Sequence, residues 1–138
     1  MVDADRLGRL LDELGRYRAH LEVLRDVAAH DYRGDRAFAG RYLVQASAQV
    51  CIDAANHVIA SSGWRTPADF RDAFNVLEEN GVVDGPLAER MRALAGLRNR
   101  LVHVYEGVDD RIVHESLAEG LGDLDAFSRA IARLARDA

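Results

Sequence analysis

Apolar residues recur at intervals of three and four along most of the chain, and this spacing constrains the fold more than any other feature. The first stretch shows the pattern in its leucines: Leu7, Leu10, Leu11, Leu14, Leu21 and Leu24. Residues three and four apart lie on one face of an α-helix, so each such stretch predicts a helix with one apolar side. No segment shows the sustained apolar–polar alternation of a strand. We therefore expect an all-α protein.

Turn-favouring and helix-capping residues divide this pattern into five segments. The turn residues are Gly34 with Asp35, Ser61-Ser62-Gly63 and Asn80-Gly81. The expected N-terminal signals are Thr66 with Asp69 in the first turn, Asp84 with Pro86, and Asp109 or Asp110. The expected helices cover roughly residues 3–31, 36–61, 66–80, 86–105 and 110–134. This order predicts an antiparallel bundle of four long helices and one short helix, in a single domain over residues 1–138.

Length and composition narrow the class of protein. With 138 residues, of which 49% are apolar, the chain can build one continuous core. It has no apolar run of about 18 residues and no signal-peptide pattern, so we expect no membrane span and a cytoplasmic location. A single cysteine excludes an internal disulfide framework. The net charge of −5 argues against indiscriminate nucleic-acid binding but allows a small basic site.

One basic stretch, Arg98-Asn99-Arg100-Leu101-Val102-His103-Val104-Tyr105, concentrates residues that can act on a phosphodiester. Four arginines and no acidic residue lie between Arg90 and Tyr105. A guanidinium binds phosphate through paired hydrogen bonds, and an imidazole exchanges protons near neutral pH. Arg98 and His103 are therefore candidates for cleaving a phosphodiester without a metal.

Geometry and simpler explanations leave alternatives open. Residues five apart lie about 140° apart around a regular helix, so Arg98 and His103 do not face one site from one straight helix. Either the helix unwinds near His103, or two chains assemble the site. The arginines are also compatible with a solvated helix face, His103 with a structural histidine, and Tyr105 with a helix-end residue.

The pattern Arg98-Asn99-x-x-x-His103-x-Tyr105 on a small helical chain resembles the HEPN superfamily, and within it the HepT toxins. Two further motifs support the resemblance, Asp53-x-x-Asn56-His57 and Phe74-x-x-Leu77-x-x-x-Gly81-Val82. Together they extend it over roughly residues 36–130. The resemblance implies a metal-independent endoribonuclease toxin that works as a homodimer with a composite site. It also implies a partner, the nucleotidyltransferase antitoxin MntA, which attaches AMP to the tyrosine that matches Tyr105.

We assign roles to these residues on this basis. His103 transfers protons and Arg98 holds the phosphate and stabilises its developing charge. Asn99, Arg100 and Asp53 support the site or contact RNA, and Tyr105 contacts RNA or orients His103.

We expect neither a metal nor an organic cofactor. Asp53 and His57 share a helix face, but two ligands do not make a metal site, and no glycine-rich phosphate loop occurs. The alternative function is a non-catalytic HEPN helical module that binds a nucleotide or a nucleotidyltransferase partner.

Overall fold

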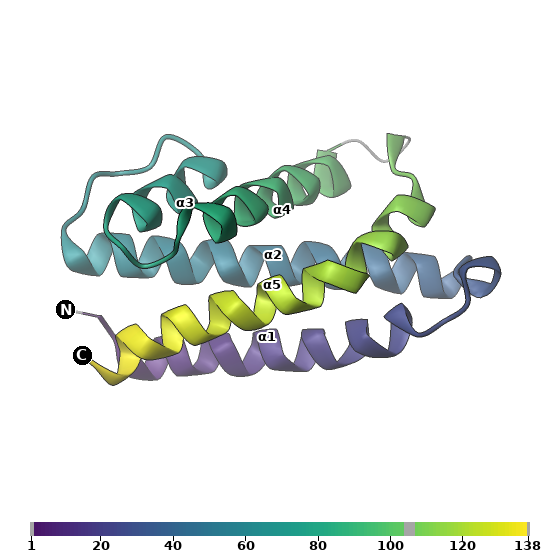
Figure 1. The fold of residues 1–138 in the computed structure, drawn as a ribbon, viewed down its shortest axis with the longest axis horizontal. Coiled ribbons are helices and arrows are strands. Elements are labelled where there is room, and N and C mark those ends of the chain that lie inside the picture. The colour runs from purple at the N-terminus through teal and green to yellow at the C-terminus, as the bar shows by residue number, and fades with distance from the viewer. Residues whose placement is uncertain (1, 104–106, 138) are drawn as a thin grey trace.

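A computed structural model describes residues 2–103 and 107–137, and within these residues it contains helices and no strand. The long helices are α1 (Ala4–Arg25), α2 (Asp35–Ser62), α4 (Gly85–His103) and α5 (Asp110–Arg136). A short α3 (Phe70–Glu79) precedes α4, and a 3-10 turn, η1 (Ala29–Asp31), precedes α2. Consecutive long helices run in opposite directions (Figure 1). The expected all-α antiparallel bundle is therefore confirmed.

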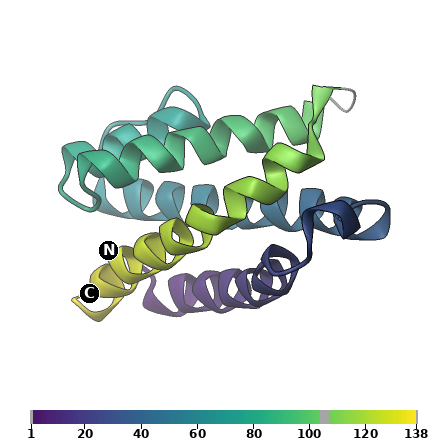
Figure 2. The same ribbon diagram turned by 45° about the vertical axis from the view of Figure 1, so that its right-hand side comes forward.

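The bundle is organised around α2. This helix packs against α1 and α5 on one side and against α3 and α4 on the other, as the turned view shows (Figure 2). Many of its buried residues are small, among them Ala48, Cys51, Ala54 and Ala55. Small side chains let neighbouring helices approach closely, so α2 contacts every other helix of four or more turns and also α3. Burial raises the pKa of the Cys51 thiol, which makes it an inert core residue.

Several helix ends lie where the sequence predicts them. Asp84 accepts a hydrogen bond from the Leu87 N–H at 2.8 Å, and Asp109 caps α5 through the Arg111 N–H at 3.0 Å. Gly63 ends α2 with a φ of 70°, in the left-handed region that glycine adopts without strain. Within the described residues, no helix is long and apolar enough to span a membrane.

The predicted end of the first helix is wrong. The first helix stops at Arg25 rather than near residue 31, and the chain then turns through η1. This turn brings Tyr32 into the core, where its ring stacks on His114 at 4.2 Å and covers Gly40. His114 also contacts α1, because its Nε2 lies 3.0 Å from the Leu24 carbonyl oxygen.

The N-cap of α3 is Asp69, not Thr66. Asp69 accepts a hydrogen bond from the Asp72 N–H at 2.7 Å, and α3 begins at Phe70. The residues before it are held in an extended loop because the Asp72 carboxylate accepts the Ala68 N–H at 2.8 Å and also binds Arg65. The contacts of Asp72 with Ala68 and Arg65 hold the loop in this conformation, and they outweigh the local preference of threonine for a cap.

Candidate active site on helix α4

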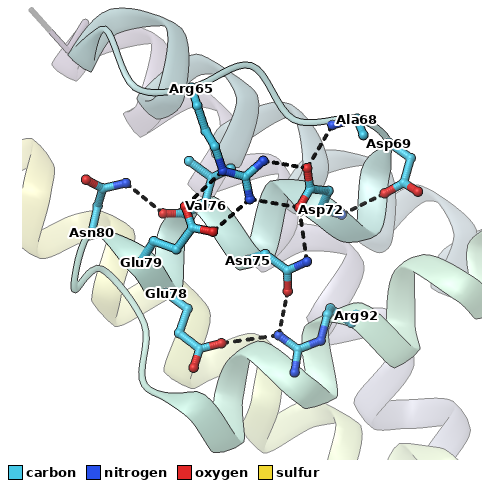
Figure 3. A network of polar contacts seen from close by, with 10 residues as sticks. All are labelled: Arg65, Ala68, Asp69, Asp72, Asn75, Val76, Glu78, Glu79, Asn80 and Arg92. Carbon is cyan, nitrogen blue, oxygen red and sulfur yellow. Dashed lines mark hydrogen bonds and ion pairs between the residues drawn. The ribbon is translucent and has the colours of Figure 1, made fainter.

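Two of the four arginines on α4 are paired with acidic residues. Arg90 forms an ion pair with Asp123 of α5. Arg92 donates to Asn75 Oδ1 at 2.9 Å and lies 3.3 Å from Glu78 Oε1 (Figure 3). These contacts hold α4 to α5 and α3, so the predicted basic stretch is neutralised over its first half.

A second ion-pair network fixes the start of α3 beside α4. Arg65, in the loop after α2, binds both Asp72 and Glu79 at 2.8 Å (Figure 3). Hydrogen bonding from Arg65 lowers the pKa of both carboxyl groups, and the Ala68 N–H and the Asn75 amide add to the effect at Asp72. The network holds the loop and the first turn of α3, and Phe70 is the first residue of that turn.

Arg98 differs from Arg90 and Arg92 because it has no acidic partner among the described residues. Its Nε donates to Gln49 Oε1 at 3.1 Å, and its Nη1 donates to Asn99 Oδ1 at 3.1 Å. The guanidinium carbon lies 5.0 Å from the centre of the Phe70 ring, within the range of a cation–π contact. An arginine has five N–H groups, so three have no partner within residues 2–103 and 107–137. Within the part of the chain that the structure describes, Arg98 therefore presents an oriented positive charge that no acidic side chain compensates.

Asp53 reaches Arg98 only through Gln49. The Gln49 amide nitrogen donates to Asp53 Oδ1 at 2.8 Å, and its oxygen accepts from Arg98. The neutral amide thus stands between the carboxylate and the guanidinium. Neither Gln49 nor Phe70 is found by sequence reasoning. The only local signal for Gln49 is its position one helical turn before Asp53.

Arg100 and His103 are exposed, and neither makes a hydrogen bond or ion pair with another described residue. Arg100 lines a groove of about 470 Å³ between α4 and α5, together with Leu94, Leu97 and Ile112. His103 is the last residue of α4. Arg98, in contrast, points toward α2 and α3, so Arg100 belongs to a different surface.

The structure does not bring Arg98 and His103 of one chain into contact. α4 is helical through His103, so no unwinding before that residue turns the two side chains together. Residues five apart on such a helix point about 140° apart. Tyr105 lies outside the described residues.

His57 has a structural contact of its own. The Asp3 backbone N–H donates to His57 Nε2 at 3.0 Å, which joins the N-terminal segment to α2. No group of three or more His, Cys, Asp or Glu side chains suited to a metal ion occurs among the described residues.

Comparisons with known proteins agree with this helical framework. The chain is 32% identical over 84 residues to an mRNA nuclease HepT of Shewanella oneidensis, a match that covers 61% of this chain and 63% of that relative. It is 27% identical over 124 residues to a tRNA nuclease HepT of Aphanizomenon flos-aquae, which covers 88% of this chain and 84% of the relative. Its match to the Shewanella protein thus spans less than two thirds of that relative's length.

A solved structure supports the fold. The tri-AMPylated Shewanella oneidensis HEPN toxin, in complex with an MNT antitoxin, superimposes with a TM-score of 0.84 at 24% identity, over 95% of this chain and 98% of the other. The family model described as Ribonuclease HepT-like matches residues 34–131. Because this match covers well over half of the sequence, the chain belongs to the ribonuclease HepT-like family.

Proposed function

We propose that this protein is a metal-independent endoribonuclease toxin that a nucleotidyltransferase antitoxin of the MntA type neutralises. In this proposal residues 1–138 act as one HEPN-like unit. The observation that carries it is the state of Arg98, which is oriented by Gln49, Asn99 and Phe70 and has no acidic partner among the described residues. An oriented guanidinium with free N–H groups is suited to a phosphate.

The chemistry follows from the groups of the substrate and of α4. The 2′-hydroxyl of RNA attacks the adjacent phosphorus, its proton passes to a base, and the 5′-oxygen leaves after it receives a proton. His103 supplies proton transfer, which contributes about 10²–10⁴-fold in rate. Arg98 binds the phosphate and stabilises the charge of the transition state. The products are a 2′,3′-cyclic phosphate and a free 5′-hydroxyl.

A homodimer resolves the geometry of a single chain. Since Arg98 and His103 diverge around α4, one protomer does not direct both side chains to one phosphate. A symmetric pair brings two copies of α4 to one axis, so Arg98 of one chain can act with His103 of the other. Two histidines can then divide the roles of acid and base.

The relatives support the proposal that a partner controls this protein. The Shewanella oneidensis toxin is AMPylated and bound to its antitoxin in the solved structure. We infer that Tyr105 is the acceptor in this chain, because its place two residues after His103 matches the tyrosine of the HepT pattern. Each AMP adds bulk and one negative charge beside the site, and both effects oppose RNA binding. With partner and ATP, intact-mass measurement should show AMP adducts on the wild type and none on Tyr105→Phe.

The proposal is tested by induced expression without the partner. Arg98→Ala and His103→Ala should each abolish growth arrest and RNA cleavage. Arg90→Ala is the matched control, because it removes an arginine from the same helix that is already paired with Asp123. Folded His103→Ala protein that cleaves RNA at the wild-type rate would contradict the assignment. A wild type that binds the partner but never cleaves RNA would favour the non-catalytic alternative.

A further inference from the structure

The amide of Gln49 stands between one negative and one positive side chain, and its orientation is fixed by both. An ionised carboxylate only accepts hydrogen bonds, and a guanidinium only donates them. The amide nitrogen must therefore face Asp53, and the amide oxygen must face Arg98, as the distances of 2.8 Å and 3.1 Å show. With the amide reversed, its oxygen would face the carboxylate of Asp53 and its nitrogen would face the N–H of Arg98. Neither hydrogen bond could then form.

Other arginines of this chain show what a direct carboxylate contact does. Arg41 donates from Nε and Nη2 to the two oxygens of Asp110 at 2.6 and 2.9 Å. Arg18 binds Asp125 through the same two nitrogens at 2.9 and 3.0 Å. In both pairs the carboxylate occupies the Nε edge of the guanidinium and compensates its charge. At Arg98 the same Nε donates to a neutral oxygen instead.

We propose that Gln49 is a positioning residue that orients Arg98 while keeping the Asp53 carboxylate away from it, and that this separation sets the affinity of Arg98 for a phosphate of an RNA strand. The inference rests on the proposed function. Asp53 acts through Gln49 and does not contact RNA: its charge fixes the amide, and the amide fixes the guanidinium. Phe70 supports the guanidinium without neutralising it.

The amide of Gln49 and the carboxylate of Asp53 can be exchanged without changing the atomic composition of the protein. The double variant Gln49→Glu/Asp53→Asn has the same atoms and the same net charge as the wild type. It moves the carboxylate from position 53 to position 49, where it contacts Arg98 Nε directly. The hydrogen bond to Arg98 becomes stronger, because it now joins two charged groups. The orientation of Arg98 is retained, but the separation between its guanidinium and a carboxylate is lost.

Three measurements on RNA define the expected result. The exchange variant should raise the KM for a short RNA at least about tenfold, because a charged hydrogen bond of this kind is worth a factor of ten or more. It should weaken binding of a single-stranded RNA oligonucleotide in a His103→Ala background by a similar factor. Its plot of log affinity against log salt should flatten by about 0.7, the slope of one lost phosphate contact.

Two further variants serve as controls. One tests the loss of the hydrogen bond that orients Arg98, and the other tests the addition of a negative charge elsewhere on α2. Gln49→Met removes the hydrogen bond to Arg98 and adds no carboxylate, so it should weaken RNA binding less than the exchange variant does. Ala39→Glu adds a carboxylate at an exposed position of α2, ten residues or about 15 Å along the helix from Gln49, and should leave KM within about twofold. If the exchange variant does not fold in thermal unfolding, Gln49→Glu alone takes its place and should show the same loss.

The outcomes distinguish this inference from the proposed function. If Arg98→Ala abolishes cleavage while the exchange variant equals the wild type or binds RNA better than Gln49→Met, the inference is wrong and the function stands. If Arg98→Ala cleaves RNA normally, the role assigned to Arg98 fails although the protein is still a ribonuclease. If the wild type itself does not cleave RNA, the proposed function fails, and RNA binding in the His103→Ala background still tests the inference. Equal RNA binding by wild type and exchange variant overturns it there too.

Discussion

Gly40 of α2 packs against the Tyr32 side chain, and replacing Gly40 with alanine should destabilise the protein. A Cβ atom at Gly40 would lie 1.7 Å from Tyr32 Oη and 2.9 Å from Cζ. Tyr32 is 6% exposed, and its ring stacks on His114 with 4.2 Å between the ring centres. The ring therefore has to move, and its stacking on His114 has to change with it.

The size of the effect is a balance of two contributions. Glycine to alanine inside a helix stabilises by up to about 1 kcal/mol, and α2 continues for several turns beyond Gly40. Overpacking of a well-filled core costs about 1–3 kcal/mol. We expect a net loss of about 1–2 kcal/mol, which lowers the midpoint of thermal unfolding by roughly 3–8 °C in a domain of this size.

Thermal unfolding followed by circular dichroism checks the prediction, with Gly15→Ala as the matched control. Gly15 lies in α1, where an added Cβ would meet no atom within 4 Å, so this change should stabilise the protein. Tyr32→Phe should cost little, because the buried hydroxyl has no hydrogen-bond partner among the described residues. Combined with Gly40→Ala, it removes the nearest clashing atom and should recover part of the loss. A Gly40→Ala protein as stable as Gly15→Ala would refute the reasoning.

Three further predictions concern chemistry, assembly and pH. Cleavage should continue in excess EDTA and leave 2′,3′-cyclic phosphate ends; activity restored only by magnesium or manganese would contradict this. Mixed Arg98→Ala and His103→Ala chains should regain activity through a shared site, whereas a strictly monomeric active protein would exclude sharing. Because Arg65 lowers the pKa of Asp72 and Glu79 below the ordinary 3.8 and 4.5, their contribution is full above about pH 5 and declines as the pH falls. The urea midpoint of unfolding, measured between pH 3 and 7, should therefore fall less with decreasing pH in Arg65→Ala than in the wild type. The same dependence of the urea midpoint on pH in both proteins would contradict the role of the network.

The sequence predicts the parts of the fold that depend on neighbouring residues. The caps at Asp84 and Asp109 involve backbone groups two or three residues away, and Gly63 terminates α2 through its own φ. The apolar spacing likewise predicts the helices. Thr66 fails as a cap because the contacts that place Asp69 there include Arg65 and Asp72, which lie on both sides of the loop.

The candidate site is predicted only in part for a similar reason. Arg98 and His103 stand out through their residue types and spacing, but Gln49 is 49 positions away and becomes a partner only when α2 packs on α4. Phe70 likewise contacts Arg98 only because α3 begins where the Arg65 network holds it. Residue chemistry along the chain does not reveal such cross-helix contacts.

The central position of α2 has a consequence for how the molecule opens. The residues around Gln49 and Asp53 are flanked by fully buried neighbours such as Ile52 and Ala54. Backbone amides in such a segment exchange with solvent deuterium only when the whole domain unfolds. The last turn of α4, with exposed Arg100 and His103, should exchange through local fraying instead. The side of the candidate site that orients Arg98 should then persist as long as the fold, while the side that carries His103 should change conformation without unfolding of the domain.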